Sequence, residues 1–247
     1  MVAIVNCSFF THAGQYHTQR NMPNEDCIYS ATLDQVVSAA VCDGAGTASE
    51  GSTAARLISR LVSDYLCLEF KNLYYCDTDS TRRKLAQLIN EHLKSYASEQ
   101  HMEESRLATT ILAAAMDDAG HCISVHLGDG IILQRKSNEA NFTVVSSPRN
   151  GLSSNATYLT MNCNLWQNLR VHRWAVTANT HLLLMTDGAM PHLVRRSSHL
   201  GWHMLSPPGM TLRNMEDWLK YCEPMDDYSC VMLSWEQTRC FDSNSML

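Results

Sequence analysis

Three aspartate–glycine pairs in the sequence each come directly after an apolar stretch that is typical of a buried strand. They are Asp43 and Gly44 after VVSAAVC, Asp129 and Gly130 after SVHLG, and Asp187 and Gly188 after LLLMT. A fourth acidic pair, Asp226 and Asp227, has the reverse arrangement and stands before the apolar run YSCVML. The end of one antiparallel strand lies beside the start of its neighbour, so these carboxylates are predicted to meet at one edge of the sheets.

Carboxylates gathered this closely favour a site for divalent cations. They repel one another, and each raises the pKa of its neighbours unless a cation lies between them. Ligands that are all oxygen atoms suit Mg²⁺ or Mn²⁺. Asp–Gly is also a common turn dipeptide, so any one pair taken alone favours a turn rather than a ligand. The repetition of the pattern at strand ends is what favours a metal site.

The elements that must position these residues follow from the spacing of apolar residues. Strands are predicted at residues 2–10, 27–32, 36–42, 107–116, 122–127, 131–135, 181–186 and 229–235. Helices are predicted over residues 54–66, 85–96 and 211–221, with a short helical stretch from Ala189. Residues 146–179 carry little pattern. Strands interleaved with paired helices predict an α+β arrangement of sheet and helix layers, not a parallel sheet with crossover helices.

The overall composition excludes several classes of protein. The chain has 247 residues, of which 45% are hydrophobic and 18% charged, as in ordinary globular proteins. A net charge of −6 argues against nucleic-acid binding, which needs a basic surface. No apolar run is long enough to span a membrane, and the first residues do not resemble a signal peptide. The ten cysteines include no Cys-x-x-Cys pair, so reduced thiols in the cytoplasm are expected rather than a thiolate zinc site.

The acidic motifs, taken in order, resemble those of the metal-dependent protein phosphatases of the protein phosphatase 2C type. They are NED at 24–26, VCDGAG at 41–46, ATTILAAAM at 108–116, HLGDG at 126–130, LLLMTDG at 182–188 and DDYSCVML at 226–233. The resemblance runs from Gly14 to about Leu233. GQYH at 14–17 and the stretch at 150–160 are similar to the bacterial branch of this family.

The resemblance implies a fold and a domain organisation. The expected fold is a four-layer αββα sandwich, in which two antiparallel sheets are flanked by pairs of helices. One catalytic domain is expected over residues 1–236, with a flap-like region at about 146–179 beside the site. A polar C-terminal tail is expected over residues 237–247.

The resemblance also implies the ligands of two divalent cations, Mn²⁺ or Mg²⁺. Asp43 would bridge both ions, and Gly44 would offer its backbone carbonyl. Asp187 and Asp226 would complete one ion, and Glu25 the other. Asp43 and Asp187 would thereby carry the catalysis.

Other residues are assigned supporting roles by the same resemblance. Asp129, with Asp187, resembles a pair that holds a weaker third ion in bacterial members. Asp26 would orient the waters of a metal rather than bind it, and Asp227 is given no direct role. Family members place a phosphate-binding arginine four residues before the first acid, where this chain has an asparagine. Arg20, one residue earlier, is the candidate for that role, and His17 is a second candidate.

The implied activity is that of a serine/threonine protein phosphatase. A hydroxide that bridges the two ions would attack the phosphorus of phosphoserine or phosphothreonine directly, without a phosphoenzyme. The partner would be a phosphorylated protein, with a serine/threonine kinase acting in opposition. A cytoplasmic monomer that binds neither nucleic acid nor membrane is expected.

Three other functions compete with this interpretation. A pseudophosphatase that kept the fold as an interaction module, and a metal-dependent hydrolase of small phosphate esters, both remain open. Cys76 and Arg82 also match the Cys-x5-Arg spacing of cysteine phosphatases. Asp77 and Asp79 lie between them and would repel phosphate, so this third alternative is disfavoured.

Overall fold

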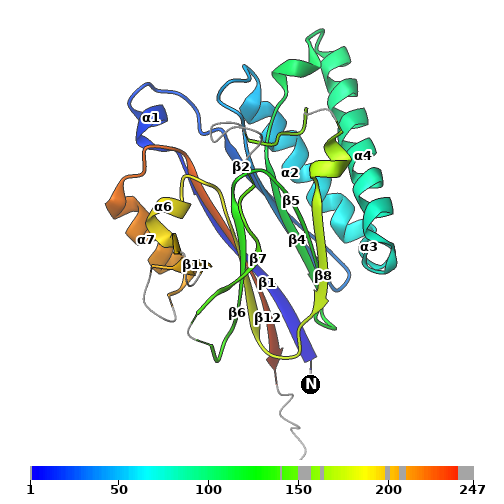
Figure 1. Cartoon of the computed structure of the whole chain (residues 1–247), viewed down its shortest axis with the longest axis vertical. Helices are drawn as coiled ribbons and strands as arrows, with labels where there is room; N and C mark the ends of the chain where they lie inside the picture. Colours follow the sequence, from blue (N-terminus) through cyan, green and yellow to red (C-terminus); the bar gives the residue numbers. More distant parts are fainter. Residues whose placement is uncertain are drawn as a thin grey trace, which may run out of the picture.

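Two five-stranded antiparallel sheets form the centre of the computed structural model, which describes residues 2–139, 141–149, 157–161, 164–197, 201–205 and 210–238 (Figure 1). The first sheet has the order β1 (Val2–His12), β12 (Tyr228–Thr238), β9 (Thr180–Met185), β6 (Ile131–Lys136) and β7 (Thr143–Ser146). The second has the order β2 (Asp26–Leu33), β3 (Val36–Asp43), β4 (Ile111–Asp117), β5 (His121–Leu127) and β8 (Arg170–Ala175). We call them the β1 sheet and the β3 sheet.

Helices cover the outer face of each sheet (Figure 1). The β3 sheet is covered by α2 (Gly51–Leu68), α3 (Phe70–Tyr75) and α4 (Thr78–Glu99). The β1 sheet is covered by α6 (Met190–Leu193) and α7 (Leu212–Cys222), next to the two-stranded ribbon of β10 (Val194–Ser197) and β11 (Gly201–Met204). Two further helices of one turn each are α1 (Gln15–Thr18) and α5 (Leu165–Asn168), and a 3₁₀ turn spans Glu104–Arg106.

Alternation along the central strands produces three apolar layers. In β3, Val37, Ala39 and Val41 face the β1 sheet, whereas Ala40 and Cys42 face α2. Because both faces of this strand are buried, its sequence is apolar at nearly every position. The outer face of the β1 sheet packs against α6 and α7 in the same way. The predicted αββα sandwich of two antiparallel sheets is therefore confirmed.

The weakly patterned region contains elements that periodicity did not reveal. Residues 146–179 include α5 and the edge strand β8, which pairs with β5 from His121↔Ala175 to His126↔Arg170. Arg170 and Arg173 of β8 donate to the backbone carbonyls of Ser147 and Leu73. Polar side chains that hold an edge strand in place break the alternation by which a strand is recognised from sequence.

The cysteine-phosphatase alternative finds no support in the fold. Asp77 caps the N-terminus of α4, because its side chain accepts a hydrogen bond from the Ser80 N–H at 2.9 Å. The Arg82 guanidinium donates to the carbonyl of Leu169 at 2.6 Å, so it ties α4 to the segment before β8. Cys76 and Arg82 therefore belong to a helix start rather than to a phosphate-binding loop.

Candidate metal centre

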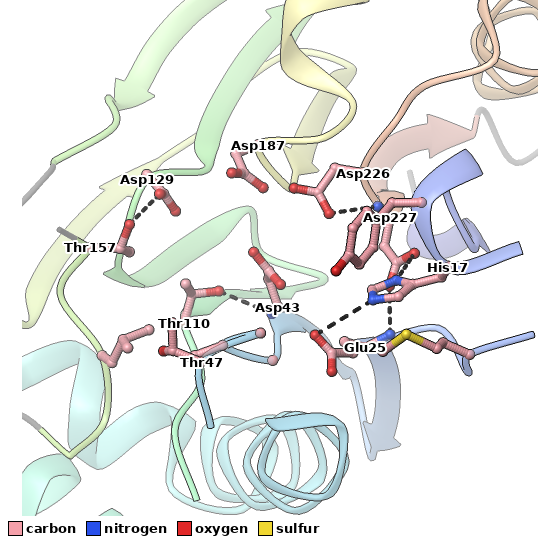
Figure 2. Close-up of a pocket in the computed structure, with 16 residues that line it drawn as sticks. His17, Glu25, Asp43, Thr47, Thr110, Asp129, Thr157, Asp187, Asp226 and Asp227 are labelled. Carbon is pink, nitrogen blue, oxygen red and sulfur yellow. Dashed lines mark hydrogen bonds and ion pairs between the residues drawn. The ribbon is translucent and has the colours of Figure 1, made fainter. Parts of the chain in front are cut away.

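The strand ends that carry the acidic motifs lie together at one end of the sandwich. β3 ends at Asp43 and β9 ends two residues before Asp187, whereas β2 begins directly after Glu25 and β12 begins directly after Asp227. The turn that holds Asp129 connects β5 of one sheet to β6 of the other. The antiparallel pairing therefore brings all the predicted acidic motifs to the same edge, as Figure 2 shows.

These side chains line one cavity of about 440 Å³. Its wall contains every acidic residue predicted to bind metal, and Gly44: Glu25, Asp43, Gly44, Asp129, Asp187 and Asp226. Asp43, Asp129 and Asp187 each offer a carboxylate oxygen within 4.8 Å of the others, a spacing that one metal ion can span. Glu25 and Asp226 lie on the same wall outside this compact group of three (Figure 2).

The backbone of Asp43 is held by two threonines that directly precede the neighbouring strand β4. Its N–H donates to the Thr110 hydroxyl at 3.0 Å, and its carbonyl accepts from the Thr109 hydroxyl at 2.7 Å. The next residue, Gly44, donates its N–H to the Glu25 carbonyl at 3.1 Å. A side chain at Gly44 would overlap the backbone of Gly51 at the start of α2, so only glycine fits this close approach. These contacts fix the relative positions of Asp43 and Glu25.

Mutual repulsion and burial raise the pKa values of the clustered carboxyl groups. Burial, followed by the charges of Asp26 and Asp187, raises the pKa of Asp43 well above its ordinary value. The pKa of Asp187 rises from 3.8 to about 6, mainly through burial and then through the charges of Asp129 and Asp226. Burial is also the main cause of the raised pKa of Asp226. Without a cation this cluster holds protons that isolated aspartates would release.

Glu25 and Asp26 occupy the same segment but face different surroundings. The Glu25 side chain is 19% exposed, and burial is the main cause of its raised pKa. Asp26 is buried, and its pKa is raised from 3.8 to about 8, again mainly by burial. One Asp26 oxygen accepts from the Thr186 hydroxyl at 2.9 Å, whereas the other has no hydrogen-bond partner. An acceptor left over beside a cluster of carboxylates is suited to a water molecule on a metal ion.

The donor set fits divalent cations. It consists of carboxylates from several strand ends and loops, next to a glycine carbonyl, and it includes no thiolate or amine among the residues predicted as ligands. The raised pKa values show that the protein alone does not balance the negative charge of these carboxylates, and one oxygen of Asp26 also has no hydrogen-bond partner. Hard cations with oxygen ligands, such as Mg²⁺ or Mn²⁺, compensate this excess of negative charge.

Two residues that were not predicted as site residues support this cavity. Thr157 donates its hydroxyl to Asp129, and Thr160 donates its N–H to the Thr109 carbonyl at 3.0 Å. This part of the predicted flap therefore runs alongside the acidic cluster, and Thr157 and Leu159 line the cavity. Most of the family-like stretch at 150–160 falls at 150–156, outside the described residues.

Asp227, which is given no direct role by the resemblance, contacts two residues of the cavity wall. It is buried and accepts hydrogen bonds from His17 and from the backbone of Glu25 (Figure 2). His17 itself lines the cavity. The pair of aspartates before β12 is the sequence signal for this role. Side chains of successive residues at a strand end point in opposite directions, so the two aspartates can have different partners.

Arg20 lies apart from the residues that line the cavity. Its guanidinium stacks over the ring of Tyr16 at 3.9 Å and donates to the Tyr16 carbonyl at 3.0 Å. Tyr16 lines the cavity, so Arg20 is one residue removed from it. The structure thus brings together the predicted metal-binding residues and leaves the predicted phosphate-binding arginine on the outer side of Tyr16.

Several solved structures share this fold. A bacterial serine phosphatase is 18% identical in sequence, with a TM-score of 0.63 over 95% of this chain and 99% of that chain. The catalytic domain of the serine/threonine protein phosphatase PstP, in complex with two manganese ions, is 13% identical, with a TM-score of 0.62 over 95% and 100%. RsbX, in complex with magnesium, is 13% identical, with a TM-score of 0.58 over 96% and 100%.

Sequence comparison is more decisive than these distant structural likenesses. No curated protein matches the chain at a significant level. The sequence model of the family described as protein phosphatase 2C matches residues 13–225. That stretch begins just before the Gly14 to His17 turn and ends just before Asp226, so it spans nearly all the elements that carry the acidic cluster. The chain therefore belongs to the protein phosphatase 2C family of serine/threonine phosphatases.

Proposed function

We propose that this protein is an active, metal-dependent phosphatase that removes phosphate from phosphoserine and phosphothreonine in proteins. The observation that carries the proposal is the convergence of Glu25, Asp43, Asp129, Asp187 and Asp226 on one open cavity. A pseudophosphatase is not expected to keep such a set, because unused buried carboxylates destabilise the fold.

The acidic residues would hold two cations in two groups. Asp43 lies between the other acids and is suited to contact both ions, with Asp187 and Asp226 on one side and Glu25 with the Gly44 carbonyl on the other. Asp129 would hold a weaker third ion together with Asp187, and it also lies within reach of Asp43. When bound, the two cations supply a polarised water as the nucleophile and neutralise negative charge on the phosphoryl group, so no phosphoenzyme is required.

The surrounding residues orient these ligands. Thr109 and Thr110 hold the backbone of Asp43 between them, and Thr157 holds Asp129. The unpartnered oxygen of Asp26 can accept a hydrogen bond from a water on a cation. Each of these contacts reduces the freedom of a carboxylate before substrate arrives, which is the purpose of preorganisation.

Phosphate binding by Arg20 stays a prediction. In the described conformation its guanidinium lies over Tyr16, and a change of side-chain rotamer would be required to reach the cavity.

The family also implies a phosphorylated protein partner and an opposing kinase. We extend the proposal to a single catalytic domain, predicted over residues 1–236, a flap at about 146–179 and a monomeric state. Of the tail predicted over 237–247, residues 237 and 238 belong to β12 instead. No helix in the described part of the chain is long and apolar enough to cross a membrane.

Hydrolysis of two substrates after removal of metals tests the proposal. The protein is stripped with a chelator and assayed on a phosphothreonine peptide and on p-nitrophenyl phosphate, with Mn²⁺ or Mg²⁺ added back. We expect metal-restored turnover of the peptide, and its loss in Asp187→Asn. Arg20→Ala is expected to raise KM for the peptide; an unchanged KM would remove Arg20 from the phosphate site.

The remaining outcomes point to the alternatives. Binding of Mn²⁺ in calorimetry without turnover of either substrate would identify a pseudophosphatase. Turnover of p-nitrophenyl phosphate without turnover of any phosphopeptide would favour a hydrolase of small esters. Activity that persists in the chelator would contradict metal dependence itself.

A further inference from the structure

The carboxylate of Asp227 lines the same cavity as the other acids, yet both of its oxygens accept hydrogen bonds from the protein. Its side chain is 3% exposed. One oxygen accepts from the Gly14 N–H at 2.8 Å and from His17 Nδ1 at 2.7 Å. The other accepts from the Glu25 N–H at 2.6 Å. We call these three hydrogen bonds the Asp227 clamp; two of them lie in Figure 2.

The clamp joins three segments that are far apart in the sequence. Gly14 and His17 belong to the turn after β1, Glu25 directly precedes β2, and Asp227 directly precedes β12. The backbone reinforces the first of these junctions, since the N–H groups of residues 15 and 16 donate to the carbonyls of Pro224 and Met225. A side chain at Gly14 would overlap the backbone of Asp226, so the close approach requires glycine.

Two consecutive aspartates thus have separate tasks. Asp226 lines the cavity, and one of its oxygens accepts from the N–H of Asp227 at 2.9 Å. Asp227 also lines the cavity, but both of its carboxylate oxygens are taken up by the clamp. Through the Glu25 N–H it fixes where the Glu25 side chain starts, and through His17 it places imidazole Nε2 3.9 Å from Glu25 Oε2. The imidazole ring of His17, which the Asp227 carboxylate orients, therefore lies on one side of the Glu25 carboxylate.

We propose that Asp227 is a positioning residue, and that it holds Glu25 in place for one of the two cations. This inference rests on the proposed two-cation site and adds a division of labour to it. The Asp227 side chain contacts Glu25 directly and through His17, whereas Asp226 accepts from the backbone N–H of Asp227, which an asparagine would keep, and Asp187 follows β9. Loss of the clamp should weaken the cation on the Glu25 side and spare the other.

An asparagine at this position cannot replace the clamp. Its amide has one acceptor oxygen and one NH₂ group, and the latter would face either the Glu25 N–H or the Gly14 N–H, donor against donor. The side chain keeps its size, so Asp227→Asn removes hydrogen bonding with little change in packing. Loss of groups that orient a metal ligand commonly weakens metal affinity by about 10- to 100-fold.

Titration of the metal-stripped full chain with Mn²⁺, followed by the electron paramagnetic resonance signal of free Mn²⁺, measures the two sites separately from activity. In the unsubstituted protein we expect two Mn²⁺ sites. In Asp227→Asn we expect one site of unchanged affinity and one weakened by about 10- to 100-fold. His17→Leu leaves two of the three clamp bonds, so it should weaken the same site by a smaller factor and covers the case in which Asp227→Asn does not fold.

A matched control is available at the opposite end of the sandwich. Asp117 accepts from both the N–H and Nδ1 of His121, at 2.7 and 2.8 Å, so it is a second aspartate–histidine pair far from the acidic cluster. Asp117→Asn should bind both Mn²⁺ ions as the unsubstituted protein does. Circular dichroism in chelator establishes that each variant is folded.

The outcomes separate this inference from the proposed function. Two unchanged sites in folded Asp227→Asn and His17→Leu, or equal weakening of both sites, would overturn the positioning role. No Mn²⁺ binding by the unsubstituted protein would instead overturn the two-cation site on which it rests.

Discussion

Single carboxylates in this protein are distinguished by what surrounds them rather than by their chemistry. Asp26 and Asp227 are buried and Asp43 is half-buried. Asp43 faces other acids, Asp26 has one unpartnered oxygen, and Asp227 accepts three hydrogen bonds. The first arrangement is unfavourable without a cation, and the last is satisfied by the protein alone. The first is therefore suited to binding metal, and the last to holding the backbone in place.

Substitution of Asp43 by asparagine separates stability from activity. Metal-dependent turnover should fall by more than about 100-fold, because the group that contacts both cations is lost. The melting temperature of the metal-free protein should rise by a few degrees, because a buried carboxylate beside other acids is replaced by a neutral group. Peptide hydrolysis with Mn²⁺ and thermal unfolding in chelator measure the two effects. Full activity in the variant would refute the role of Asp43.

At the scale of elements, strand ends rather than strand interiors carry the site. The ladder of β3 with β4 ends at Val41↔Leu112, and beyond it Asp43 contacts the two residues before β4: its carbonyl accepts from the Thr110 N–H at 2.9 Å and from the Thr109 hydroxyl, and its N–H donates to the Thr110 hydroxyl. β4 begins at Ile111, four residues after the start of the apolar pattern at residue 107. The next contact is the isolated bridge from Gly44 to Thr109, so the chain leaves the sheet in a fixed direction.

Thr110→Val tests whether these contacts position Asp43. The hydroxyl that accepts the Asp43 N–H is lost with little change in shape, which leaves a backbone donor without a partner at a cost of about 1–3 kcal/mol. We expect kcat to fall about 10- to 100-fold through misplacement of the carboxylate, and the melting temperature to fall as well. Ser38→Ala is the matched control on β3, since Ser38 contacts Ser63 of α2 far from the cluster. An equal loss of activity in both variants would mean that stability alone is responsible.

In the whole molecule, acidic side chains lie together at one end of the sandwich. Their mutual repulsion must be offset by the stability of the rest of the fold. Strands from both sheets end there, and the apolar layers on either side of each sheet supply the stability. Because burial in these layers also removes water from the carboxylates, the same packing that stabilises the fold raises their pKa values. The metal-free protein should therefore respond to pH as a unit.

Stability of the metal-free protein should decrease as pH rises from about 4 to 8. The folded-state pKa values of Asp187 and Asp26 are raised from 3.8 to about 6 and about 8, so the folded state holds protons that the unfolded chain has released. Their stabilising contribution is complete below the unfolded value and is lost as pH rises through the folded values. Melting temperatures in chelator across this range measure the trend, which Asp26→Asn should reduce near its upper end. Saturating Mn²⁺ should oppose it, and a flat or rising profile without metal would contradict the shifts.

The sequence by itself determined the layers of sheet and helix and, through the family resemblance of its motifs, the sandwich and the members of the acidic cluster. Buried strands such as β3 and β9 are apolar on both faces, so their positions and the carboxylates at their ends can be read without coordinates. The ordered motifs then indicated which acids belong together. Such features are local, because a strand, its turn and the residue that ends it lie within about ten positions of one another.

Only the tertiary structure decided which residues position that cluster. β8 is an edge strand with charged side chains, so its sequence lacks the alternation of a half-buried strand. The resemblance assigns Arg20 to phosphate, and only the structure shows that its guanidinium lies over the ring of Tyr16. The clamp of Asp227 joins residues more than 200 positions apart. Its partners are set by packing of β1, β2 and β12 at one edge, and no periodicity in the sequence records which backbone N–H groups a buried carboxylate will meet.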